Sequence, residues 1–152
     1  MTYTLAADGS SDRVLLPLLT WSLERHGIGS VLAQWADFQR IPPQPNLAAR
    51  LNRAIDLYPC DILFVHRDSE GQSRDIRCQE ISDAVAGLAT IRHVPVIPVR
   101  MTEAWLLFDE SAIRRAAGNP NGRQDLHLRP VRELERLADP KKTLHDAIVR
   151  RQ

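Results

Sequence analysis

The feature that most constrains the fold of this chain is an apolar run followed directly by charged residues. The run 62–65 leads directly into His66, Asp68 and Glu70, and Gly71 follows. Its length and composition predict a buried strand, and open α/β sheets place their active sites at the carboxyl ends of such strands. Two acids two residues apart at a strand end suggest a metal ion, because hard cations prefer carboxylate oxygens. The alternative interpretation is a polar loop in which Gly71 turns the chain.

Strand-like and helix-like segments alternate along the rest of the sequence. Runs rich in apolar and β-branched residues predict four strands, at 3–7, 31–36, 61–65 and 94–99. Apolar residues with helical spacing predict helices that end near His26, Tyr58, Ala89, Phe108, Ala117, Leu137 and Arg151. Alternation of this kind indicates a mostly parallel sheet with helices on both faces. We therefore predict an α/β protein with a three-layer, Rossmann-like sheet of about four strands.

Individual residues indicate how some of these elements begin and pack. Pro95 and Pro98 predict that the last strand lies at a sheet edge or is short, because proline cannot donate to the hydrogen-bond ladder. Ser10 or Ser11 is expected to cap the first helix, with Asp12 at its positive end. The helix after the last strand is expected to bury three large apolar residues: Trp105, Leu106 and Phe108.

Length and composition narrow the class of protein. The 152 residues predict a single domain, 1–152, with a helical C-terminal extension from about residue 110. No apolar run approaches the ~20 residues that a membrane helix needs. The N-terminus lacks the pattern of a signal peptide, and two cysteines are too few for a disulfide framework or a zinc site. We expect a cytoplasmic protein without a membrane partner.

The net charge of +1 hides an asymmetry along the chain. Residues 1–112 carry 10 basic and 14 acidic side chains, whereas residues 113–152 carry 10 basic and 5 acidic ones. Nearly all basic residues are arginine, which suits bidentate contacts with phosphate. A basic C-terminal third beside an acidic site is consistent with a nucleic-acid ligand, and a solvated basic surface is the alternative.

Acidic residues follow three of the predicted strands. Asp8 ends the first strand, Asp68 and Glu70 follow the third, and Glu103 lies just past the last. Because parallel strands end at the same edge of a sheet, we expect these acids to converge there. Carboxylates gathered in one place repel each other, so a metal ion or a protonated acid is expected among them. Two Mg²⁺ ions in such a site can clamp the attacking and leaving oxygens of a phosphodiester.

Four short motifs resemble a known family. An acid–glycine turn at 8–12 and the His-Arg-Asp of 66–68 are similar to the two-part signature of the TOPRIM (topoisomerase–primase) domain. The glutamate–alanine–tryptophan segment at 98–107 and the Asp-Pro-Lys of 139–141 resemble motifs of a TOPRIM-like family of small bacterial proteins of unassigned function. Members of that family occur beside AAA-type ATPases in proposed anti-phage defence modules. The resemblance covers most of the chain, roughly residues 3–144.

The chain departs from the TOPRIM pattern at two positions. The first acid of the signature is usually glutamate, and here it is Asp8, which is one methylene shorter. The first acid of the later D-x-D turn is replaced by His66, which binds transition metals but is a poor Mg²⁺ ligand. Glu70 can replace the lost carboxylate, so that Asp68 and Glu70 form the working pair.

The resemblance implies roles for particular residues. The catalytic candidates are Asp8, Asp68 and Glu103. The metal ligands would be Asp8, Asp68, Glu70 and His66, holding Mg²⁺ or Mn²⁺. The phosphate-binding candidates are Arg67, Arg100 and Lys141, for each of which an ordinary surface or capping role is the alternative.

These predictions lead to one main hypothesis about function and to others that stay open. The main one is a metal-dependent nuclease with a TOPRIM-like fold that cleaves DNA or RNA in a defence system. The first alternative is a non-catalytic binding or regulatory subunit of an AAA-type ATPase, favoured by His66 in place of an acid. A nucleotide phosphotransferase ranks last, because the chain has no P-loop. The sequence is also compatible with a homo-oligomer.

Overall fold

The chain forms two compact units. A computed structural model describes residues 1–69, 71–88, 91–98 and 101–149. The first unit, here the sheet unit, consists of Met1–Arg67 and Gln72–Ile97. The second, the helical unit, consists of Asp68–Gly71 and Pro98–Gln152. The sequence predicted one domain with a helical extension from about residue 110. In the structure, the long segment of the helical unit begins earlier, at Pro98.

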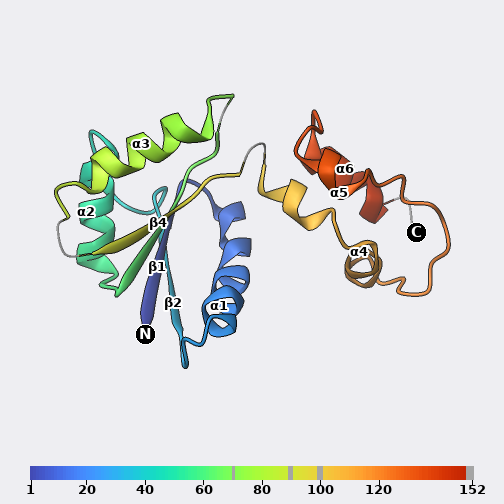
Figure 1. Ribbon diagram of the computed structural model, residues 1–152, viewed down its shortest axis with the longest axis horizontal. Helices are drawn as coiled ribbons and strands as arrows, with labels where there is room; N and C mark the ends of the chain where they lie inside the picture. The colour runs from blue at the N-terminus through green and yellow to red at the C-terminus, as the bar shows by residue number, and fades with distance from the viewer. Residues whose placement is uncertain (70, 89–90, 99–100, 150–152) are drawn as a thin grey trace. The chain divides into compact units, whose positions relative to one another are not determined.

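The sheet unit is built on four parallel strands. They are β1 Thr2–Ala7, β2 Leu32–Asp37, β3 Ile62–His66 and β4 Arg92–Val96, in the spatial order β2-β1-β3-β4 (Figure 1). β1 and β3 are therefore the two central strands, and their buried residues are flanked by strands on both sides. β4 lies at an edge, as its prolines predicted. The predicted α/β class and four-stranded parallel sheet are confirmed.

Helices cover both faces of this sheet. They are the 3₁₀ helix η1 Ser10–Val14, α1 Leu15–Arg25, α2 Leu47–Leu57 and α3 Arg74–Val85. Figure 1 shows α1 on one face and α2 with α3 on the other. Asn46 caps α2 and Ser73 caps α3, each by accepting the backbone N–H three residues on. Because each helix follows a strand, the first turns of α2 and α3 begin near the carboxyl edge of the sheet.

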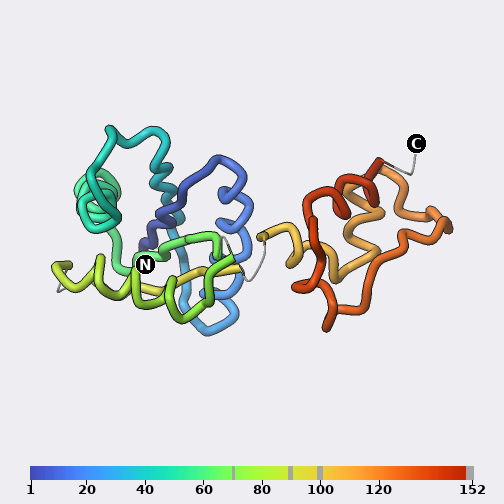
Figure 2. The backbone as a smooth tube through the Cα atoms, turned by 90° about the horizontal axis from the view of Figure 1, so that it is seen from above, coloured from blue at the N-terminus to red at the C-terminus, as the bar shows by residue number. Residues whose placement is uncertain are grey.

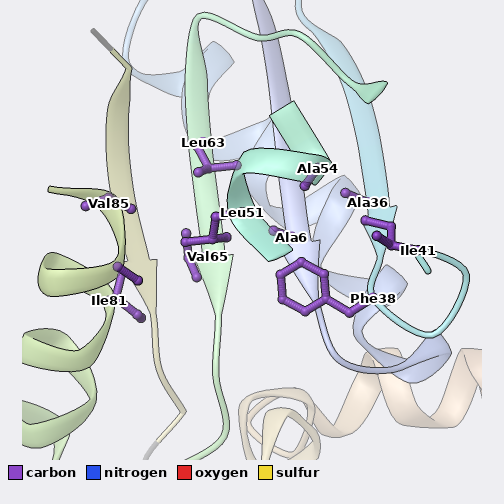
Figure 3. Close-up of a cluster of buried hydrophobic side chains, with 11 residues drawn as sticks. Ala6, Ala36, Phe38, Ile41, Leu51, Ala54, Leu63, Val65, Ile81 and Val85 are labelled. Atoms are coloured by element: carbon purple, nitrogen blue, oxygen red, sulfur yellow. The ribbon is translucent and has the colours of Figure 1, made fainter. Parts of the chain in front are cut away.

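Side chains along each strand point alternately to the two faces of the sheet, and this determines which of them form the core of the sheet unit. Leu63 and Val65 of β3 pack with Ala6 of β1 beneath α2 and α3 (Figure 3). The intervening Phe64 faces α1, where its ring lies 5.3 Å edge-on from that of Tyr3. The cluster on the α2–α3 side is completed by buried residues of β2, its following loop and the two helices: Ala36, Phe38, Ile41, Leu51, Ala54, Ile81, Ala84 and Val85.

The helical unit is made of short helices. They are the 3₁₀ helix η2 Thr102–Leu106, α4 Glu110–Ala116, α5 Val131–Leu134 and α6 Pro140–Val149. The segment 117–130 between α4 and α5 is irregular throughout (Figure 2). The unit has its own buried cluster, consisting of Leu107, Ile113, Leu126, Leu134 and Ala147.

One packing prediction in the helical unit is wrong. Phe108 was expected in the core, but it is 66% exposed, and Leu107 is the residue that is buried. Trp105 and Leu106 are half-buried. The reason is that η2 is a 3₁₀ helix, which has three residues per turn rather than 3.6 and ends before Phe108.

Among the described residues, no helix has both the length and the apolar character needed to cross a membrane.

Candidate functional site

The carboxyl end of β1 turns through Gly9 into η1. The Gly9 N–H donates to Asp12 Oδ2 at 3.1 Å, and the Asp12 N–H donates to the Gly9 carbonyl at 3.2 Å. The predicted cap by Ser10 or Ser11 is therefore wrong. A carboxylate makes stronger hydrogen bonds than a hydroxyl, and Asp12 lies in the first turn of η1, where an acid is favoured.

His66, the last residue of β3, lies against Asp12. Its Nδ1 is 3.3 Å from Asp12 Oδ2, and the two residues are 1% and 8% exposed. Burial disfavours the charged form of Asp12, but contacts with His66 and the Gly9 N–H outweigh it, so the pKa of Asp12 lies below its ordinary value of 3.8. This contact ties β3 to the turn after β1. A structural role explains His66 without a metal ion.

Asp8 faces two arginines from different elements. Its Oδ2 accepts from Arg67 Nη1 at 2.7 Å, and its Oδ1 accepts from Arg50 Nη1 at 3.3 Å. Arg67 follows β3, whereas Arg50 lies on the first turn of α2. The Asp8 side chain is 44% exposed and that of Arg50 is 40% exposed, so this contact is open to solvent.

A second acid holds Arg67 from its other side. Arg67 Nη2 lies 3.2 Å from Glu80 Oε1, and Arg77 Nη1 donates to Glu80 Oε2 at 2.7 Å. Arg67 is only 17% exposed, and the acid on each side of its guanidinium fixes that group in place. The alternating charges of Arg50, Asp8, Arg67, Glu80 and Arg77 form a network that we call the edge network.

Two members of this network, Arg50 and Glu80, were not among the residues singled out from the sequence. Arg50 lies on α2 and Glu80 lies on α3. A signal was available: in an α/β sheet, the first turn of each covering helix lies beside the carboxyl edge of the strands. Polar residues at the starts of α2 and α3 were therefore candidates for the same edge as Asp8.

A hollow opens beside Asp8 and Arg50. Its volume is about 310 Å³, within the lower range of small-molecule sites. The other wall is the segment 38–44, which follows β2. The lining is mixed, consisting of Asp8, Phe38, Gln39, Ile41, Pro42, Pro43, Gln44 and Arg50. A guanidinium group, a carboxylate, two amides and apolar surface therefore meet in one place.

The remaining predicted site residues do not belong to the sheet unit. Asp68 is exposed, Glu103 is half-buried in the first turn of η2, and Lys141 is exposed in the first turn of α6. Their convergence with Asp8 stays a prediction. Glu70 and Arg100 lie outside the described residues.

The helical unit has a hollow of a different kind. It measures about 340 Å³ and is lined by Ala104, Trp105, Phe108, Val131, Leu134 and Glu135. Among the described residues of this lining, Glu135 is the charged one, and it carries the wrong sign for phosphate. Arg50 and Arg67 lie in the sheet unit, and the phosphate contacts predicted from the sequence stay predictions.

The described donors of the sheet unit do not fit a resident Mg²⁺ or Mn²⁺. Both oxygens of Asp8 face guanidinium groups, which would repel a divalent cation placed between them. Across the described part of the chain, no three His, Cys, Asp or Glu side chains are grouped so that they could hold a metal ion. The predicted metal site needs Asp68 and Glu70 as well, and it stays a prediction. The edge network as it stands favours an anion.

Comparison with known proteins gives no match to this chain. No family model, no curated protein and no solved structure corresponds to it. The TOPRIM-like resemblance therefore stays a prediction that rests on the motifs at 8–12, 66–68, 98–107 and 139–141.

Proposed function

We propose that this protein is a nuclease-like protein that binds a nucleic-acid phosphodiester at the carboxyl edge of β1 and β3. The observation that carries the proposal is the position of Asp8 between Arg50 and Arg67, beside an open hollow. The same edge is where open parallel sheets bind ligands.

The two arginines support phosphate as the ligand. Guanidinium groups bind carboxylates and phosphates with the same forked donors, so a pair that holds one oxyanion is suited to a second. Arg67 is fixed by Glu80, so little side-chain entropy is lost when it binds. Arg50 is 40% exposed and is free to contact a ligand from the solvent side.

Asp8 is the residue to which we assign the proton transfer in hydrolysis. A water oxygen bonds to phosphorus, the bond from phosphorus to the leaving oxygen breaks, and Asp8 accepts the proton that the water loses. The leaving oxygen takes a proton from solvent. Arg50 and Arg67 neutralise the charge that develops on the phosphate oxygens. No step is assigned to a metal ion.

The test is cleavage of end-labelled single- and double-stranded DNA and RNA by the full chain. Reactions contain Mg²⁺, Mn²⁺ or EDTA, because the sequence predicted these two ions as cofactors. We expect products from the wild-type chain in at least one of these reactions, and none with the Asp8→Asn variant. Arg53→Ala is the matched control, because Arg53 is an exposed arginine on the same helix as Arg50.

Two outcomes would contradict the proposal. The first is the absence of both cleavage and binding for every nucleic acid. The second is cleavage that Asp8→Asn leaves unchanged, because the activity would then come from another site or from a contaminant. Thermal unfolding of each variant confirms that a loss of activity is not a loss of the fold.

A second function is favoured by the burial of His66. The TOPRIM pattern has an acid at this position, and here the residue packs against Asp12 instead. This supports a non-catalytic binding or regulatory subunit, which would dock on an AAA-type ATPase. Nucleic-acid binding without cleavage under any condition, together with co-purification of such an ATPase, is the result expected of this alternative.

A further inference from the structure

The segment 38–44 forms a wall of the hollow beside Arg50, and its first part is held by hydrogen bonds. The buried carboxylate of Asp37 accepts the Gln39 N–H at 2.9 Å, and the Asp37 carbonyl accepts the N–H groups of Arg40 and Ile41. Ile41 is 6% exposed and belongs to the core of the sheet unit. The first part of segment 38–44 is thus anchored by its backbone and by its apolar side chains.

Two prolines stiffen the rest of this wall. Pro42 and Pro43 fix their φ angles, so the wall loses little entropy when a ligand binds. The side chain of Gln44 bends back and donates from Nε2 to the Pro42 carbonyl at 3.1 Å. Pre-organisation of this kind is expected of a binding surface rather than of a plain connection between β2 and α2.

The chemistry of the hollow suits a flat ring beside a phosphate. Phe38 and the two prolines offer apolar surface, and the Arg50 guanidinium lies 5.8 Å from the Phe38 ring centroid. The Gln39 amide, and the amide oxygen and second N–H of Gln44, supply hydrogen-bonding groups at the same place. Glutamine amides pair with the edges of nucleobases, and flat apolar or guanidinium surfaces stack on them.

From this arrangement, and resting on the proposed function, we propose that the hollow binds an unpaired nucleobase. The base belongs to the nucleotide whose phosphate lies on Arg50 and Arg67. Arg50 lines the hollow and also contacts Asp8, so the position proposed for the base adjoins the position proposed for the phosphate. A base in a duplex is stacked and paired, so it cannot enter. The protein therefore selects single-stranded nucleic acid.

The experiment measures fluorescence anisotropy of labelled oligonucleotides of about ten nucleotides, a length typical of one single-strand binding module. Three probes are compared: a single strand, the same backbone without bases, and the corresponding duplex. We expect the single strand to bind about tenfold more tightly than the abasic strand, which is the lower part of the range for stacking of one base. The Gln44→Trp variant, which fills the hollow, should abolish this difference, whereas Gln124→Ala in the helical unit should retain it.

The outcomes separate this inference from the proposed function. Equal binding of the single strand and the abasic strand overturns the base pocket but leaves phosphate binding intact. Tighter binding of the duplex also overturns it. If none of the three probes binds, the proposed function itself fails. Because residues 39 and 44 are not buried, Gln39→Ala provides a second variant that removes one amide with little effect on the fold.

Discussion

The two faces of one sheet edge each hold a contact between a carboxylate and a basic side chain, and these contacts differ in burial. His66 and Arg67 are consecutive, so alternation sends their side chains to opposite faces. His66 reaches Asp12 on the α1 face, where both residues are almost fully buried. Arg67 reaches Asp8 on the other face, where the acid is 44% exposed. The first contact is closed to solvent, and the second is open to it.

The difference in burial determines how much each contact should contribute to stability. Removing one member of a buried polar pair is costly because the other is left without solvent, whereas an exposed ion pair contributes about 1 kcal/mol or less. Substitutions in the Asp12–His66 pair should therefore lower stability. Substitutions in the edge network should change ligand binding more than stability.

The largest effect is expected at His66. His66→Ala removes the side chain that packs against the buried Asp12 carboxylate, which keeps its local contacts with Gly9 and Ser11, and we expect a loss of about 3 kcal/mol in the free energy of unfolding. The measurement is urea denaturation near neutral pH. The control is His93→Ala, because His93 is exposed on the edge strand β4 and should cost under about 0.5 kcal/mol. Equal losses for the two variants would contradict a structural role for His66.

The next largest effect is expected at Arg67. Arg67→Ala removes the fixed guanidinium of the edge network, and we expect oligonucleotide affinity to fall by more than tenfold. The free energy of unfolding should fall by only about 1 kcal/mol, because Asp8 and Glu80 keep access to water. Anisotropy titration and urea denaturation give the two numbers. A variant that loses stability but binds as well as wild type would place the ligand elsewhere.

The stability supplied by Asp12 should depend on pH. Because folding lowers the pKa of Asp12, its contribution is complete above about pH 4 and is lost as the pH falls through the lowered pKa. We expect Asp12→Asn to cost about 1.5 kcal/mol near pH 5, and the difference from wild type to shrink toward pH 2.

The control for this prediction is Asp125→Asn. Asp125 and His127 are also 3.3 Å apart, but both are exposed, so their pair should contribute little at any pH. Urea denaturation at fixed pH values measures both variants. A difference between wild type and Asp12→Asn that does not change below pH 4 would show that the carboxylate is not held in its charged form by folding.

The smallest effect, with the opposite sign, is expected at Asp8. Asp8→Asn removes the negative charge that competes with phosphate for Arg50 and Arg67. We expect oligonucleotide affinity to rise about threefold while cleavage is lost. A decrease in affinity would mean that the Asp8 charge is needed for binding, through a cation or through the positions of the arginines.

The sequence predicted the framework of this protein better than its side-chain contacts. The strand–helix alternation predicted the parallel sheet, and the prolines of β4 predicted its edge position. The alternation of side-chain directions along β3 was not extended beyond His66. Extended by one residue, it sends Arg67 to the face of Asp8 and leaves His66 on the face of Asp12. Arg50 was missed because only residues that follow the strands were considered for the sheet edge, and not the first turn of the next helix. Glu80 lies beyond the first turn of α3, and its contact with Arg67 depends on how that helix packs against the sheet. The role of Phe108 was wrong because residue spacing does not distinguish a 3₁₀ turn from an α-helix.

The salt dependence of oligonucleotide binding tests most directly whether Arg50 and Arg67 bind phosphate. For single strands, the slope of log affinity against log salt decreases in magnitude by about 0.7 for each phosphate contact that is lost. We predict this decrease for Arg50→Ala, relative to wild type, and no change for Arg53→Ala on the same helix. Identical slopes for wild type and Arg50→Ala would show that Arg50 contacts no phosphate and would contradict the proposed site.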